Sequence, residues 1–175
     1  MYRIDYYVFP GSIEWEYKCK GKYGAKGEKR GEREKPTPEQ MARQNQMNRE
    51  NRVRRLIKAN FQENDYWVCL KYPAGSRPEL ETVKEDMRKF LRRIRGCWKK
   101  KGYELKYVYR LEIGKNGGPH VHIIVNRIPD ADLRIKENWG HGNVDFPSPT
   151  RKGVLRGWQA ISSNCPMAVK NRQIN

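Results

Sequence analysis

The stretch Arg110-Leu-Glu-Ile-Gly-Lys-Asn-Gly-Gly-Pro-His-Val-His-Ile-Ile-Val-Asn126 predicts a β-hairpin that carries a site on one face. His120 and His122 are two residues apart in a run rich in β-branched residues, so both imidazoles point to the same face of one strand. The segment from Leu105 to Ile113 is a second strand, and Gly117-Gly118 supply the turn. In such a hairpin, Glu112 lies beside the two histidines.

Two imidazoles and a carboxylate are a suitable donor set for Mg²⁺, Mn²⁺ or Zn²⁺, and they leave positions open for substrate oxygens. The alternative is that the histidines are simply two polar side chains on the solvent face of a half-buried sheet. The apolar run Ile123–Val125, the acidic residue on the facing strand and the cationic chain around them favour a metal site. We therefore predict that His120, His122 and Glu112 bind a divalent metal, Mg²⁺ or Mn²⁺.

The charge of the chain indicates a polyanionic partner. Thirty-seven Lys and Arg against 20 Asp and Glu give a net charge of +17 over 175 residues, and nucleic acid is the usual partner of such a protein. A membrane surface is the second candidate, but no long apolar run or leader is present, so we expect a soluble, cytoplasmic protein that does not bind membranes. The four cysteines form no C-x-x-C pair, which argues against a zinc ribbon and a disulfide framework.

The first 60 residues predict a hairpin, a basic loop and a basic helix. Residues Tyr2–Phe9 and Ile13–Cys19 alternate as two strands do. The segment Lys20–Lys35 has hardly any apolar residue and is either a solvated linker or a flexible basic arm for a phosphate backbone. Thr37 is the expected N-cap of a helix that runs to about Asn60 and includes Arg55 among its cations.

The next 40 residues predict a strand and a long helix. The continuous apolar character of Tyr66–Tyr72 favours a central strand. Ser76 and Glu79 form a capping-box pattern at the start of the helix. An apolar stripe at helical spacing predicts the core contacts: Leu80, Val83, Met87, Phe90, Leu91, Ile94 and Trp98. The opposite face, with Arg88 and Arg92, is either an ordinary solvated face or part of a nucleic-acid footprint.

Beyond the histidines, Pro129–Trp139 predicts a short helix that ends at Gly140, and Gly142–Phe146 predicts a short strand. His141, between two glycines, is expected to be a turn residue and not a ligand. The element order ββαβαββαβ predicts an α+β fold in which helices cover one face of a mainly antiparallel sheet. The open face then carries the two histidines.

These residues resemble the HUH endonuclease superfamily and, within it, the rolling-circle replication initiators of plasmids and filamentous phages. Three features carry the resemblance: the strand Trp67-Val-Cys-Leu-Lys-Tyr72, the motif Pro119-His-Val-His-Ile-Ile124, and Glu112 upstream. The resemblance spans roughly Asp65 to Phe146. The first strand departs from the family's usual motif, which has threonines where this chain has Cys69 and Lys71. The resemblance implies a ferredoxin-like palm and a nuclease domain over residues 61–155.

The resemblance also implies a reaction. In this superfamily a tyrosine hydroxyl attacks a phosphate of single-stranded DNA, forms a 5′-phosphotyrosyl link and frees a 3′-OH. His120, His122 and Glu112 would hold the metal that stabilises the developing charge. The nucleophile should follow on a helix with a Tyr-x-x-Lys motif, but the last tyrosine of this chain is Tyr109, so the expected catalytic residue is missing.

The tail, residues 156–175, shows neither helical period nor strand alternation. When the codons of Arg156–Asn164 are read in a shifted frame with wobble bases chosen freely, Gly-Leu-Ala-Ser-Tyr-Leu-Ile-Lys is permitted. The tyrosine codon then falls across Ala160 and Ile161, near the expected place of the nucleophile. We hypothesise a frameshifted gene copy, and a wobble base other than T at Ala160 would refute it.

The expected partner is single-stranded or hairpin DNA at a replication origin. Five basic residues are candidates for contact with DNA phosphates: Lys106, Arg110, Arg88, Arg92 and Arg55. Lys106 and Arg110 flank the site, and the alternative for these two is that they are ordinary solvated strand residues. One alternative is a non-catalytic nucleic-acid-binding module, in which Tyr107 and Tyr109 stack on bases unless they are buried. Such a module would bind nucleic acid unchanged in chelator. The other alternative is a relative of single-tyrosine transposases or relaxases.

Overall fold

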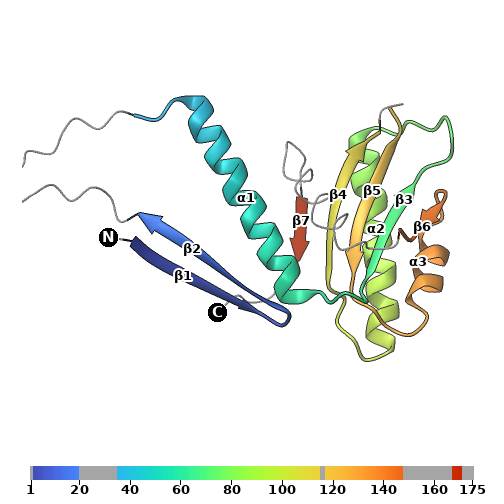
Figure 1. Ribbon diagram of the computed structural model, residues 1–175. Helices are drawn as coiled ribbons and strands as arrows, with labels where there is room; N and C mark the ends of the chain where they lie inside the picture. Colours follow the sequence, from blue (N-terminus) through green and yellow to red (C-terminus); the bar gives the residue numbers. More distant parts are fainter. Residues whose placement is uncertain (1, 20–34, 115–116, 148–166, 171–175) are drawn as a thin grey trace, which may run out of the picture. The chain divides into compact units, whose positions relative to one another are not determined.

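The computed structural model describes residues 2–19, 35–114, 117–147 and 167–170 (Figure 1). The chain divides into two compact units, residues 1–59 and 60–175. Helices and antiparallel sheets make up both units, which confirms the predicted α+β class.

The first unit contains a hairpin and a long helix. Strand β1 (Tyr2–Phe9) pairs antiparallel with β2 (Ser12–Cys19), and helix α1 spans Pro38–Asn60. The predicted capping box is present: the Gln40 amide donates to Thr37 Oγ1, and the Thr37 amide donates to Gln40 Oε1. The basic loop expected over residues 20–35 lies, except for its last residue, outside the described residues.

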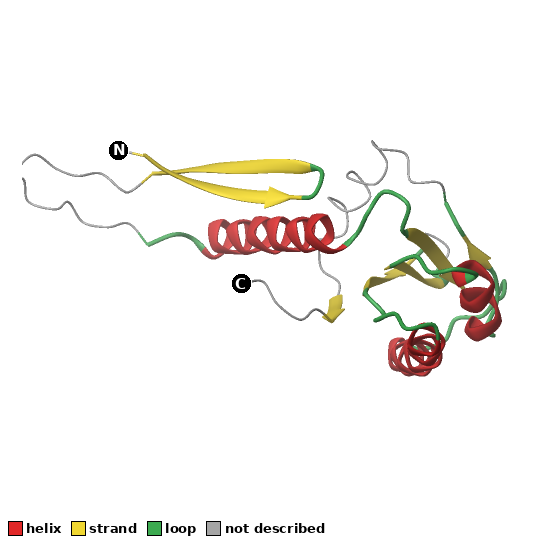
Figure 2. Ribbon diagram, turned by 90° about the horizontal axis from the view of Figure 1, so that it is seen from below, coloured by secondary structure: helices red, strands yellow, loops and turns green. Residues whose placement is uncertain are grey.

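The second unit is a sheet with helices on one face (Figure 2). Its elements are β3 (Tyr66–Lys71), α2 (Leu80–Lys100), β4 (Tyr107–Ile113), β5 (Pro119–Val125), α3 (Ala131–Trp139), β6 (Val144–Asp145) and β7 (Met167–Lys170). The strand order is β6-β3-β5-β4-β7, and every pair is antiparallel. Strand β5 is therefore the middle strand, and β3, expected at the centre, lies between β5 and the two-residue β6.

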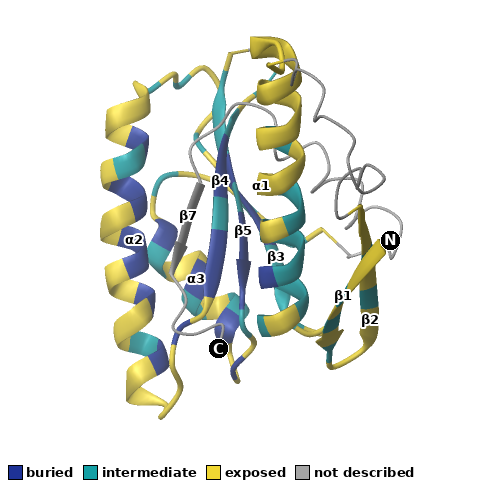
Figure 3. Ribbon diagram, turned by 90° about the vertical axis from the view of Figure 1, so that its left-hand side faces the viewer, coloured by how far each residue is buried: buried dark blue, intermediate teal, exposed yellow. Residues whose placement is uncertain are grey.

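The core lies between the sheet and the two helices. Helix α2 buries one stripe of its surface, visible along the helix in Figure 3, and the stripe matches the predicted one except for Leu80, which is exposed in the first turn. The core side chains that face it come from β3, β4, β5 and α3: Val68, Leu70, Leu111, Val121, Ile123, Ile135 and Trp139. Burial of each such side chain stabilises the fold by about 1.5–3 kcal/mol.

The start of α2 corrects a prediction. Ser76 does not cap the helix; the N-cap position belongs to Glu79, whose backbone is extended and whose side chain makes no capping hydrogen bond. The cause is Pro78, because a proline disfavours helical geometry at the residue before it. The helix therefore begins after the proline.

The tail corrects another prediction. Residues Met167–Lys170 form β7, which pairs with β4, although the tail was expected to contain no strand. A segment of four residues is too short for an alternating pattern to be recognised. Its strand conformation depends on its pairing with β4. The shifted-frame segment, residues 156–164, lies outside the described residues.

The connection between α3 and β6 packs on the end of β3. Helix α3 ends at Gly140 in the left-handed region (φ +70°), as predicted, and His141 follows in a bend. The Trp139 indole donates to the Lys71 carbonyl, and the Lys71 amide donates to the Asn143 carbonyl. These bonds hold β6 beside β3.

None of the helices in the described parts of the chain is long and apolar enough to cross a membrane. Cys19, Cys69 and Cys97, the cysteines that the structure describes, are free thiols.

Candidate metal centre

The hairpin β4–β5 has the predicted form. Glu112 is the register partner of His120, and Arg110 is the partner of His122. The turn is closed by the Gly117 amide, which donates to the Gly114 carbonyl at 2.8 Å, and Gly117 has a positive φ of 76° that favours glycine. The turn thereby fixes the register that places the carboxylate opposite an imidazole.

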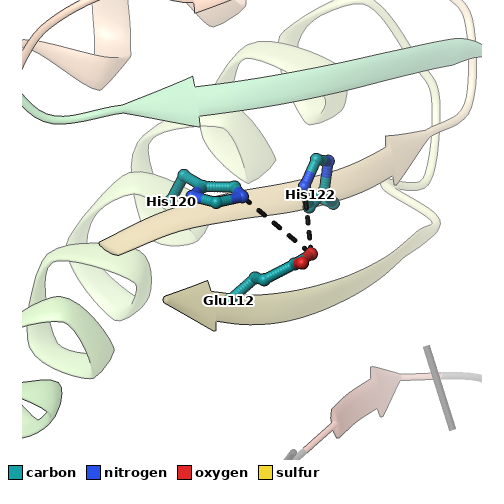
Figure 4. Close-up of side chains that lie close together, drawn as sticks. All are labelled: Glu112, His120 and His122. Carbon is teal, nitrogen blue, oxygen red and sulfur yellow. Dashed lines mark ion pairs between the residues drawn. The ribbon is translucent and has the colours of Figure 1, made fainter. Parts of the chain in front are cut away.

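Glu112, His120 and His122 converge on one point (Figure 4). Glu112 Oε2 lies 3.3 Å from His122 Nε2 and 3.9 Å from His120 Nε2. One potential ligand atom from each residue lies within 4.8 Å of the others. Ligand atoms that share one ion at about 2.1 Å lie about 3–4 Å apart, so the three side chains are close to the spacing that a metal requires.

The site lies on the sheet face opposite the helices. Side chains alternate along a strand, so the neighbours Leu111 and Val121 point into the helix-covered core while the three candidate ligands point the other way. Their side chains keep 23–41% of their surface exposed. A metal held here would retain open positions for water or a substrate oxygen.

Gly114 leaves room for the first imidazole. A Cβ at this position would lie 3.2 Å from His120 Cε1, a tighter contact than side chains usually make. The absence of a side chain at residue 114 therefore allows the imidazole to lie against the turn.

The electrostatic surroundings keep His122 neutral. Its pKa is lowered first by burial and then by His120, Arg110 and Lys71, against an opposing effect of Glu112. The neutral imidazole is the form that binds metals. The lowered pKa therefore favours the metal-binding form of His122.

One ion pair beside the site, between Lys71 and Asp145, was not predicted from the sequence. Lys71 of β3 is the register partner of His120 on the side away from Glu112, and its Nζ lies 2.5 Å from Asp145 Oδ2 of β6. The side-chain hydrogen bond to Asp145 raises the pKa of Lys71, so the ammonium is charged beside the site. No local signal identifies Asp145, because β6 is two residues long and its partner is known only from the strand order.

The other predicted DNA contacts are distributed over the chain. Arg110 is only 8% exposed and lies next to His122. Lys106 is exposed at the opposite end of β4 from Glu112, where its amide donates to Asn126 Oδ1. Arg88 and Arg92 are on the exposed side of α2, on the other face of the sheet.

Arg55 belongs to the first unit. Its guanidinium pairs with Glu14 and Glu16 and lies over the Tyr7 ring at 3.5 Å. Of the four predicted cations in the second unit, Arg110 is the one that the structure places beside the candidate ligands.

The tyrosines of the described sheet do not point toward the candidate ligands. By strand alternation, Tyr66 and Tyr107 share the helix-covered face with Tyr72 and Tyr109. The Tyr72 hydroxyl donates to Asp86 Oδ2, and burial raises the pKa of both Tyr72 and Tyr109. A phenol with a raised pKa is a poor nucleophile, and the expected place of the nucleophile, near residue 160, lies outside the described residues.

A family model described as a replication-associated protein of the ORF2 type matches residues 65–155, more than half of the chain. The chain belongs to this family. The matched segment contains β3 to β6 and all three candidate ligands, and it leaves out the hairpin β1–β2, helix α1 and strand β7. No curated protein and no solved structure matches the chain.

This replication-associated family is a family of rolling-circle replication initiators of the HUH type, so the predicted resemblance is confirmed. Membership assigns the chain to DNA replication and to binding of DNA at an origin.

Proposed function

We propose that the chain is a nuclease domain of a rolling-circle initiator, in which Glu112, His120 and His122 bind one Mg²⁺ or Mn²⁺. The observation that carries this proposal is the convergence of the three ligand atoms within 4.8 Å on the sheet face opposite the helices. When bound, the ion would polarise the scissile phosphate and stabilise the charge that develops on it.

The substrate is single-stranded or hairpin DNA that crosses this face. Lys71 and Arg110 lie on the strands to either side of β5, beside His120 and His122 respectively. Their positive charges would attract the phosphates that flank the scissile one. The histidine side chains are partly exposed, which would leave the approach to a bound metal open.

Residues 110–175 contain no tyrosine, so on this proposal they bind DNA and metal, and cleavage needs a tyrosine nucleophile that they do not supply. The tyrosines of β3 and β4 lie on the sheet face away from the site, so none of them replaces the missing nucleophile. The shifted-frame segment in the tail is the proposed remnant of the helix that carried it.

A cleavage assay tests this function. Labelled origin-like single-stranded DNA is incubated with Mn²⁺ and three proteins: the chain itself, a version whose tail carries Gly-Leu-Ala-Ser-Tyr-Leu-Ile-Lys, and a matched version with Phe in place of that Tyr. We expect only the tyrosine version to nick the DNA and to become attached to its 5′ end.

If the tyrosine version is inactive and DNA binding by the chain is the same in chelator, the nuclease proposal is refuted. A non-catalytic binding module would replace it, and the lack of a tyrosine on the site face of the described strands is the observation that favours this second candidate.

A further inference from the structure

The hairpin β1–β2 of the first unit has one face without a single charged residue. In an antiparallel pair, register partners share a face. The partners on this face are Tyr2 with Cys19, Ile4 with Tyr17, Tyr6 with Trp15, and Val8 with Ile13. The seven aromatic and aliphatic side chains among them are 40–75% exposed, and Cys19 is exposed as well.

The opposite face of the hairpin binds α1 through charges. Glu14 accepts hydrogen bonds from Arg54 and Lys58, and Arg55 lies over the Tyr7 ring. The hairpin is therefore held to its own helix by its polar face. The apolar face, which a folded chain normally buries, is the face that remains exposed.

The size of this face is that of a protein interface. A fully buried aromatic side chain covers about 150–250 Å², so the four aromatic residues, at 58–68% exposure, present on the order of 500 Å². The three aliphatic side chains bring the total toward the roughly 800 Å² that each partner contributes to a standard interface. Apolar patches of this size on a protein surface mark interaction sites.

The chemistry of the face selects the partner. A platform for single-stranded nucleic acid combines aromatic rings with cations that bind the phosphates. The described hairpin has its two cations, Arg3 and Lys18, on the other face, where both pair with Asp5. An uncharged face fits another uncharged face, and the same face on a second copy meets this condition without any further partner.

We propose that the apolar face of β1–β2 is a homodimer interface, in which the hairpins of two chains pack face to face about a two-fold axis. The two sheets would lie about 10 Å apart, with Tyr6 and Trp15 near the centre of the interface. This proposal concerns the region before the family match and does not rest on the proposed nuclease function.

Sedimentation velocity on the full chain over a range of concentrations and salt tests the dimer. We expect a mass that rises from 20.8 kDa to twice that value with concentration. Added NaCl should favour the dimer, because it screens the repulsion between two chains of net charge +17. The double variant Tyr6→Thr/Trp15→Thr places threonine, a residue that suits strands, at both positions and should weaken dimerisation by at least about 100-fold.

The matched control is Tyr103→Thr, which removes an exposed tyrosine elsewhere and should leave the dimer unchanged. Circular dichroism shows whether each variant is folded. A wild-type chain that stays monomeric at all concentrations, or a folded double variant that still dimerises, would overturn the proposal. A monomer whose affinity for an oligodeoxynucleotide falls in the double variant would also overturn it and assign the face to nucleic acid.

Discussion

At the scale of single residues, the candidate centre depends on two local facts. His120 and His122 share a face because they are two residues apart in a strand, and Glu112 lies beside them because the hairpin register makes it the partner of His120. Both facts could be predicted from one short stretch of sequence.

The Glu112 carboxylate is the first of the candidate ligands to test. Glu112→Gln keeps the size of the side chain and removes its charge. We expect it to lower Mn²⁺ affinity by more than the roughly 10–100-fold that changes in supporting residues cost, as measured by calorimetry. An unchanged affinity would show that Glu112 is not a ligand.

Gly114 is expected to position the first histidine. In Gly114→Ala, the new Cβ would lie 3.2 Å from His120 Cε1 and displace the imidazole. We expect Mn²⁺ affinity to fall several-fold while the melting temperature changes little. Gly118→Ala is the control, because a Cβ there meets nothing within 4 Å. Equal effects of the two substitutions would contradict this role.

The surroundings of the centre could not be predicted residue by residue. Lys71 and Asp145 come together only because β3 lies between β5 and β6, and that order depends on pairing between distant segments. Arg88 and Arg92 were grouped with the site by charge alone, and the sheet separates them from it.

At the scale of elements, local patterns predicted the helices and strands better than their ends. The apolar stripe of α2 was predicted from its spacing, whereas the capping pattern at Ser76 was overridden by Pro78. Strand β7 was missed because its hydrogen bonds depend on β4, which is more than 50 residues earlier in the chain.

Two glycines are expected to respond to alanine in opposite ways. A Cβ at Gly142 would lie 2.5 Å from the Lys71 carbonyl, so Gly142→Ala should separate the α3–β6 connection from β3 and destabilise the fold by about 1–3 kcal/mol. Gly96 lies within α2, and a Cβ added there would meet no atom within 4 Å, so Gly96→Ala should stabilise the fold by about 0.5–1 kcal/mol. Thermal unfolding measures both, and a stable Gly142→Ala variant would refute the packing argument.

At the scale of the whole molecule, the two units are stabilised differently. The second unit has an apolar core between sheet and helices, whereas the described contacts of the hairpin with α1 are mainly ionic. The first unit should therefore be the more sensitive to pH.

Glu14 is the expected source of this sensitivity. Burial acts to raise its pKa, but hydrogen bonds from Arg54 and Lys58 outweigh burial and lower it to about 2. A lowered folded-state pKa stabilises the fold above the unfolded value of 4.5, and this stability is lost as pH falls toward 2. We expect hairpin amides to lose hydrogen-exchange protection over that range. Glu14→Gln should destabilise the unit by about 1–3 kcal/mol at neutral pH and flatten the pH dependence; an unchanged profile would contradict the assignment.

The measurement that tests the central claim most directly is Mn²⁺ binding to the full chain by calorimetry, with three matched histidine variants. We expect one ion per chain, loss of binding in His120→Ala and in His122→Ala, and unchanged binding in His141→Ala, since His141 lies in the bend after α3 on another part of the unit. Binding that survives the loss of His120 and His122, or that is lost equally with His141, would contradict a metal centre on the β4–β5 hairpin.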